Sequence, residues 1–136
     1  MTYVSTKLRE AIIKRAGGCC EYCRIPEAFS SVAFHIEHII ASSHGGDTVE
    51  NNLALSCSRC NLYKGTNIAA ADPQTGDPTF LFHPRRQEWL EHFYLNQAVI
   101  EALTPEGRAT IFVLRLNDQE RVEQRNLLIQ FAQYPC

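Results

Sequence analysis

Two C-x-x-C pairs constrain this sequence more than any other feature: Cys20 with Cys23, and Cys57 with Cys60. A C-x-x-C turn lets two thiolates reach one ion, and Zn²⁺ prefers four such ligands in a tetrahedron. Because 33 residues lie between the two pairs, the intervening chain must form structure of its own. We predict a structural zinc site, since four protein ligands leave no coordination position open for chemistry.

Cys19 and Cys136 complete the set of six cysteines. Cys19 competes with Cys20 as a ligand, but its spacing to Cys23 is the less usual one. Cys136 has no close partner in the sequence. We therefore predict that both are free thiols. The alternative is a set of disulfides, which a secreted chain would favour.

The length and composition are those of one globular domain. The chain has 136 residues, 45% hydrophobic and 21% charged, which are globular values. No apolar run approaches the roughly 20 residues of a membrane span, and the first 15 residues lack the apolar core of a secretory signal. We expect a single domain over residues 1–136, located in the cytoplasm and without a membrane partner.

Charge is unevenly distributed along the chain. The formal net charge is -2, but residues 1–19 carry +3 and residues 65–136 carry −3. If a polyanion binds, the N-terminal end is the favoured contact face. A solvated helix face is the simpler interpretation of the same residues.

Between the cysteine pairs the sequence predicts a strand, a second strand and a helix. Val32 to His38 alternates as a strand does, and Leu53 to Leu55 forms the second strand. A helix is expected from Cys57 to about Ile68, because Asn61 and Lys64 would then lie one turn apart and face the same site.

Two caps are expected around this unit. Ser5 or Thr6 can cap a helix that runs to about Ala16 and is stopped by the two glycines that follow it. After the glycine pair at 45 and 46, Asp47 is expected to cap a turn of helix with Glu50 three positions on.

The C-terminal part, residues 72–136, is predicted to pack on the 19–68 unit as an extension. The segment "ADPQTGDP" is predicted to be a turn outside the core, and Glu88 to Leu95 a helix. "AVIEAL" and "RATIFVL" are expected to form a β-hairpin around Thr104-Pro105-Glu106-Gly107, and Asn117 to start a last helix.

A histidine and carboxylate cluster lies inside the cysteine pairs, in His35-Ile36-Glu37-His38. Neighbouring strand residues point to opposite faces, so Glu37 and His38 would diverge. A strand that ended at Glu37 would instead bring both side chains toward the helix that carries Asn61.

These residues resemble the HNH endonucleases, whose fold is called ββα-metal or His-Me finger. The resemblance covers Cys20 to Asn67 and rests on the two C-x-x-C pairs, Glu37-His38-Ile39, Gly45-Gly46-Asp47, Asn52-Leu53 and Asn61-x-x-Lys64. It implies an α+β fold: a ββα-metal core with a zinc site made by the four cysteines, an N-terminal helix, and a C-terminal extension of helix, β-hairpin and helix.

The resemblance also implies residue roles. His38 matches the general base that activates water, and Asn52 matches the asparagine that holds the loop and the base in place. Asn61, with Glu37, matches the residues that bind the catalytic divalent ion. Carboxylate and amide oxygens suit Mg²⁺ or Mn²⁺, and histidine titrates near neutral pH.

Three positions depart from the family pattern. Glu37 stands where Asp is frequent, Ala41 where Pro is common, and His44 where a basic residue is usual. The role of His35 stays open: it is a metal ligand, a residue that supports a ligand, or a surface residue. As simpler alternatives, Asn61 caps a helix and Lys64 is solvated.

The predicted function is a metal-dependent endonuclease that hydrolyses DNA. Lys64 or Arg59 would assist at the phosphate. Arg85 and Arg86 are the first candidates for a further DNA contact, with the alternative that this segment packs Trp89 on the core. The competing hypothesis is a non-catalytic, zinc-stabilised module that binds nucleic acid or protein.

Overall fold

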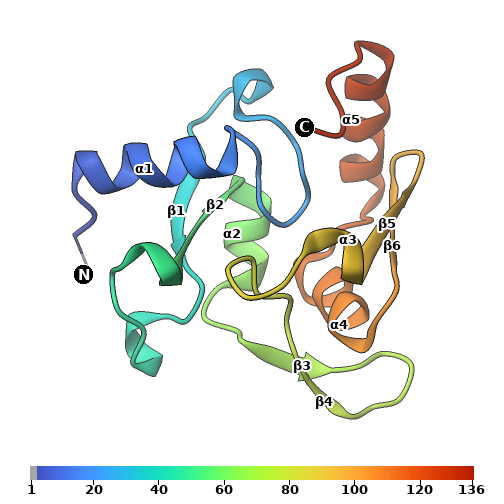
Figure 1. Ribbon diagram of the computed structural model, residues 1–136. Helices are drawn as coiled ribbons and strands as arrows, with labels where there is room; N and C mark the ends of the chain where they lie inside the picture. The colour runs from blue at the N-terminus through green and yellow to red at the C-terminus, as the bar shows by residue number, and fades with distance from the viewer. Residues whose placement is uncertain (1–2) are drawn as a thin grey trace.

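The chain folds into short helices and three separate two-stranded antiparallel sheets (Figure 1). This computed structural model describes residues 3–136. In chain order the elements are α1 (Thr6–Ala16), η1 (Glu27–Phe29), β1 (His35–His38), η2 (Ser42–His44), η3 (Glu50–Asn52), β2 (Leu53–Ser56), α2 (Ser58–Lys64), β3 (Ala69–Ala71), β4 (Pro78–Phe80), α3 (Trp89–His92), β5 (Phe93–Asn96), β6 (Val99–Ala102), α4 (Pro105–Leu114) and α5 (Gln119–Gln130), where η denotes a 3₁₀ turn.

Helix α1 begins and ends where its caps predict. The Ser5 side chain accepts a hydrogen bond from the Leu8 amide, and Gly17 takes the left-handed conformation at φ 64° that ends the helix. Ile12 is fully buried, and Arg15 donates to the carbonyls of Glu50 and Leu53. The helix therefore packs on β2 and on the turn before it.

Strands β1 and β2 and helix α2 form the central unit. The strands pair antiparallel, with Glu37 opposite Ala54 and His38 opposite Leu53. Every residue of β2 is buried. The predicted order of strand, strand and helix is confirmed, but β1 starts three residues later than predicted and α2 ends at Lys64, where Gly65 follows.

The loop between β1 and β2 is held by Asn52. Its side chain accepts from the Ile40 amide at 2.9 Å and donates to the carbonyls of Ile40 and Asp47 at 2.9 Å. A Cβ at Gly46 would overlap the Ile40 carbonyl oxygen, so only glycine fits there. The predicted cap at Asp47 is wrong: η3 begins at Glu50, and its cap position is Val49.

The "ADPQTGDP" segment is the turn of the β3–β4 hairpin, but it does not lie wholly outside the core as predicted. Asp72 is 1% exposed. Its carboxylate accepts two hydrogen bonds from the Arg108 guanidinium on α4, at 2.7 and 2.9 Å. The bidentate pair ties the hairpin to α4, and hydrogen bonds from Arg108 lower the pKa of Asp72.

The second hairpin and the helix after it were assigned wrongly from sequence. The hairpin pairs β5 with β6, and the predicted strand "RATIFVL" is helix α4. Thr104 accepts from the Gly107 amide as the N-cap, and Pro105 occupies the first turn. Pro and Gly fit a helix start here as well as they fit a hairpin turn. Helix α3 is also shorter than predicted, because Phe93 already belongs to β5.

The last helix is confirmed, with its first residue at Gln119. Asn117 pairs instead with the backbone of Ile100, accepting from its amide at 3.0 Å and donating to its carbonyl at 2.7 Å. The buried Arg125 donates to the Ala98 carbonyl and to the Asn117 side chain. A buried polar network thus joins α5 to the β5–β6 hairpin.

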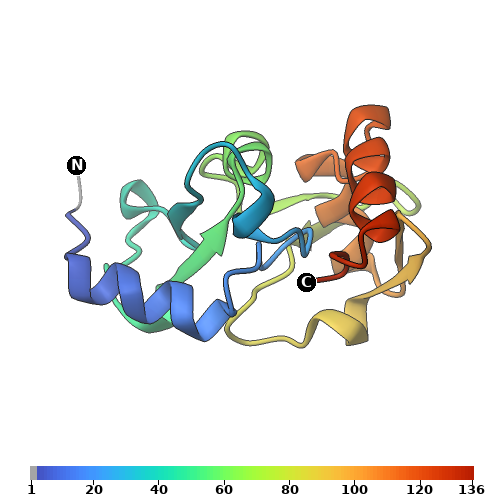
Figure 2. The same ribbon diagram turned by 90° about the horizontal axis from the view of Figure 1, so that it is seen from above.

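Helices α1 and α5 lie at opposite ends of the molecule, with the central unit between them (Figure 2). Trp89 donates its indole N–H to the Tyr22 carbonyl at 2.8 Å and packs against Phe93. This confirms the alternative in which Trp89 packs on the core. Within residues 3–136, no helix combines the length and the apolar character needed to cross a membrane.

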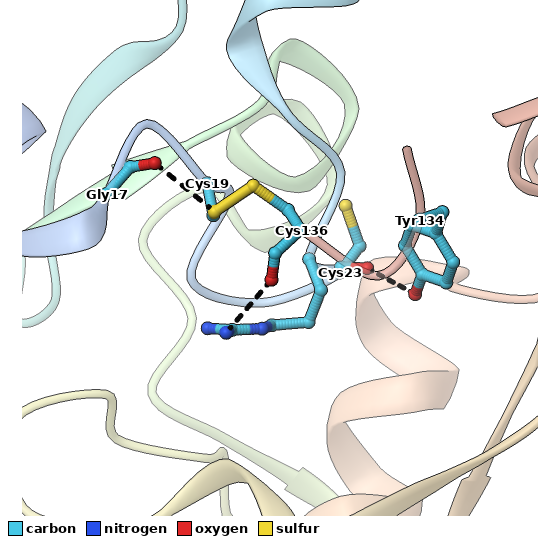
Figure 3. Close-up of a disulfide and its surroundings, with 6 residues drawn as sticks. Gly17, Cys19, Cys23, Tyr134 and Cys136 are labelled. Carbon is cyan, nitrogen blue, oxygen red and sulfur yellow. Dashed lines mark hydrogen bonds between the residues drawn. A yellow bond between two sulfur atoms is a disulfide. The ribbon is translucent and has the colours of Figure 1, made fainter. Parts of the chain in front are cut away.

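The chain's C-terminal residues close back onto the first cysteine pair (Figure 3). Cys136 forms a disulfide with Cys19 across a sequence separation of 117, and Tyr134 donates to the Cys23 carbonyl at 2.7 Å. The prediction that Cys19 and Cys136 are free thiols is therefore wrong. The two cysteines are far apart in the sequence and lie close together because of the path that the chain takes after α5, which the sequence pattern does not predict.

Candidate functional site

The four cysteines of the C-x-x-C pairs meet in one buried cluster. Their sulfur atoms all lie within 4.8 Å of one another, and Cys23 Sγ lies 3.7 Å from Cys57 Sγ. Four sulfurs at about 2.3 Å from one Zn²⁺ would lie roughly 3.8 Å apart. Burial raises the pKa of the Cys60 thiol, and the neighbouring sulfurs raise it further, so a cation is needed for all four to ionise. The donor set fits Zn²⁺, as predicted.

Arg121 of α5 contacts this cluster from the extension. Its guanidinium donates to Cys60 Sγ at 2.9 Å and to the Leu114 carbonyl at 2.6 Å, and the residue is 2% exposed. A Zn²⁺ held by four thiolates carries a net charge of about −2. The buried guanidinium would offset half of that charge and hold Cys60 in orientation.

We predict that Arg121→Met weakens zinc retention by about 10-fold to 100-fold, the usual range for a residue that supports a ligand. The measurement is zinc release to a chromogenic chelator, followed over time. Arg115→Met is the matched control, because Arg115 is exposed and pairs with Asp118 on the surface. Equal release rates for the two variants would contradict the role of Arg121.

Glu37 lies inside the molecule and is already paired. Its carboxylate accepts from the Tyr22 hydroxyl at 2.6 Å and forms an ion pair with the Lys64 ammonium. Glu37 is 5% exposed and Lys64 2% exposed, and Lys64 also donates to the Ile39 carbonyl at 2.9 Å. Burial raises the pKa of Glu37, and Lys64 and Tyr22 partly offset that rise.

This arrangement does not fit a divalent ion at Glu37. One carboxylate oxygen faces Tyr22 and the other faces an ammonium, which stands where a metal cation would have to bind. Water and phosphate would have no access to a side chain this deeply buried. A ligand role for Glu37 requires that Lys64 first leave the carboxylate. Lys64 is in the same way unavailable for the phosphate contact predicted from sequence.

His38 is oriented by a different partner. Its Nε2 lies 2.9 Å from the Thr48 hydroxyl, and the residue is partly exposed. Strand β1 runs through His38 instead of ending at Glu37, so the two side chains take opposite faces. Glu37 meets α2 through Lys64, whereas His38 meets the β1–β2 loop. The divergence expected of neighbouring strand residues is therefore confirmed, and the alternative in which the strand ends at Glu37 does not apply.

Comparison with known proteins assigns the family of the central segment. The family model of the HNH endonucleases matches residues 20–67. The similarity to an HNH domain covers residues 20–67. The resemblance inferred from the cysteine pairs and the Glu37-His38 motif is thereby confirmed. The β1–β2–α2 unit with its cysteine cluster has the α+β character of the ββα-metal fold.

The similarity reaches beyond the HNH domain in one relative. The Septu protein PtuB of Bacillus thuringiensis is 25% identical over 124 residues, which are 90% of this chain and 46% of PtuB. The chain thus spans about half the length of PtuB. No solved structure matches the chain. The HNH match indicates nuclease-type chemistry.

The other predicted residues of the HNH domain lie in different settings. Asn61 is partly exposed, and its side-chain amide has no hydrogen-bond partner within residues 3–136, so it is available to a ligand. Asn52 holds the loop that follows the His38 strand. His35 is exposed, 3.4 Å from the Ser58 hydroxyl. Arg59 forms an exposed ion pair with Glu120.

The two arginines of the extension divide between structure and surface. Arg85 forms an ion pair with Glu21, which also accepts from the Leu55 amide. The proposed DNA contact at Arg85 is therefore not supported, because its guanidinium joins the extension to the core. Arg86 is exposed, and its side chain has no ion pair among the described residues.

Sequence reasoning missed Tyr22, Thr48 and Arg121. Tyr22 sits between two metal ligands, where spacing says nothing about the direction of its side chain. Thr48 lies in a loop, and Arg121 lies 61 positions from the cysteine that it contacts. The one available indication was the presence of two arginines, Arg121 and Arg125, in the last helix. No local pattern in the sequence predicts that these arginines are buried.

Proposed function

We propose that this protein is an endonuclease that hydrolyses phosphodiester bonds in DNA, with His38 as the general base. The observation that carries the proposal is an imidazole oriented by Thr48 inside a segment matched by the HNH endonuclease family. A base oriented by a further group is the arrangement that nucleophile activation requires.

The His38 imidazole can act as a general base because one ring nitrogen is held by a hydrogen bond and the other is free. In the tautomer whose Nε2–H donates to Thr48, Nδ1 carries the lone pair that accepts a proton from water. Within residues 3–136, no protein group occupies Nδ1. Asn52 supports the base indirectly, because it fixes the loop that carries Thr48.

The catalytic divalent ion, Mg²⁺ or Mn²⁺, is implied by the family resemblance and remains a prediction. When bound, such an ion neutralises charge on the leaving oxygen. Of the two residues that the resemblance assigns to this ion, Asn61 has a free side-chain amide that offers a hard oxygen ligand. The other, Glu37, is engaged by Lys64. The cytoplasmic location also remains a prediction.

The test is His38→Ala in a plasmid-nicking assay with Mg²⁺ or Mn²⁺ titrated. We expect cleavage to fall by about 100-fold or more, because a positioned general base contributes roughly that factor. Zinc content should be unchanged. His44→Ala is the matched control, since His44 is exposed on the same loop. Wild-type cutting by the His38 variant would refute the assignment.

A second candidate, a non-catalytic module that binds nucleic acid, is favoured by the closed Glu37–Lys64 pair. It predicts that the wild-type protein binds DNA but does not cut it at any concentration of either metal. Binding to phosphate would weaken steeply with salt, because each neutralised phosphate releases counterions.

A further inference from the structure

A groove lies beside the HNH domain, where α2 and the segment after β1 face the β3–β4 hairpin and the residues that follow it. Its volume is about 480 Å³, within the range of small-ligand sites. Figure 1 shows the hairpin below α2. One wall is formed by Ile39 and Ile40, which directly follow His38, and by Lys64.

Aromatic and apolar side chains of β4 and the residues after it also line the groove. Phe80 and Phe82 line it together with Pro78 and Leu81. Phe82 is buried, whereas Phe80 is 71% exposed on a strand that pairs with β3 alone. An exposed aromatic side chain at the edge of an apolar groove offers a flat face on which a planar ring can stack.

Arg86 brings an unpaired positive charge to the groove. Arg86 and His83 line it, and the Arg86 guanidinium is unpaired within the described chain. Burial lowers the pKa of His83, and the charge of Arg86 lowers it further, which favours the neutral imidazole. Glu106 is the one carboxylate among the lining residues. The groove therefore combines an apolar and aromatic lining with the unpaired cation of Arg86.

We propose that this groove binds one unpaired nucleobase of the nucleic-acid substrate, stacked on Phe80, with an adjoining phosphate at Arg86. The charge and the aromatic face together match a nucleotide, which is flat and apolar on one side and anionic on the other. A base inside a duplex cannot present its ring face to a side chain, so the groove selects single-stranded or unpaired segments. This inference rests on the proposed function.

The test is a binding measurement, which does not depend on cleavage. In a His38→Ala background, a fluorescent oligo-dT strand, a duplex of the same length and a strand of abasic phosphodiesters are titrated by anisotropy. We expect Phe80→Ala to weaken oligo-dT binding by on the order of 10-fold, the usual loss for one stacked base. It should leave binding of the abasic strand unchanged, because the phosphate contacts remain.

Two matched variants sharpen the result. Phe112→Ala removes an aromatic side chain that is 67% exposed on α4 and does not line the groove, so it should bind oligo-dT as the parent does. Arg86→Gln should weaken both strands and reduce the salt dependence by about one counterion. Zinc content and circular dichroism confirm that each variant is folded.

Three outcomes would overturn the proposal. They are equal oligo-dT affinities for the Phe80 and Phe112 variants, an equal loss of abasic-strand binding in Phe80→Ala, or duplex binding as tight as single-strand binding. A protein partner seated on Phe80 would give the first of these. Failure of the nuclease assignment would appear separately, as a wild-type protein that binds the strand and does not cut it.

Discussion

Stripping the metal with a chelator is expected to unfold the central unit of this protein. Cys20, Cys23, Cys57 and Cys60 form a buried cluster in it, with exposures of 4% or less. Structural zinc contributes roughly 10 kcal/mol or more to the folding of small domains. Without it, four buried thiols would face one another with no metal ion among them, while α2 would lose the contact that fixes its first turn.

The measurement is thermal unfolding of metal-loaded and metal-stripped protein, with Cys57→Ser beside them. We expect the stripped protein and Cys57→Ser to lose the cooperative transition or to shift it by well over the few degrees of an ordinary substitution. Cys136→Ser is the control, because Cys136 lies outside the cluster and its loss should leave zinc bound. A stripped protein with an unchanged transition would remove the basis of the zinc assignment.

Lys64→Met is expected to be the most destabilising substitution outside the cysteine cluster. It leaves the Glu37 carboxylate in the interior with the Tyr22 hydroxyl as its remaining partner. Breaking a buried ion pair in this way costs about 3–5 kcal/mol. Replacing both partners by neutral groups of similar size is far less costly, so Glu37→Gln combined with Lys64→Met should recover most of the loss.

Urea denaturation of the two single variants and the double variant measures this coupling directly. Lys14→Met serves as the matched control, because Lys14 is exposed on α1 and should change the free energy of unfolding by less than about 0.5 kcal/mol. Additive losses in the double variant would show that Glu37 and Lys64 do not depend on each other.

The sequence predicted the parts of the fold that local chemistry decides. Helix α1 follows from its serine cap and glycine stop, and the zinc cluster from the reach of two C-x-x-C turns. The local sequence around Thr104-Pro105 is compatible with two structures, a hairpin turn and the start of a helix. The helix forms because Gly107 allows close packing: a Cβ there would overlap the His92 carbonyl oxygen.

Part of the candidate site was predictable from the sequence, but its contacts were not. The motif points to His38, Asn52 and Asn61 as candidate functional residues of the HNH segment, and their roles stay predictions. Whether Glu37 faces an ion or a lysine depends on the rotation of α2 against β1, which no spacing in the sequence specifies. The same limit applies to Arg121, whose thiol partner lies on another element.

The bond between Cys19 and Cys136 turns the chain after α1 into a covalent ring. A cut of the backbone at any one point between these two residues leaves two pieces that the disulfide still joins. The hairpin turns and the β1–β2 loop, which lie inside this ring, can therefore be nicked once without release of a fragment. Only reduction separates the pieces.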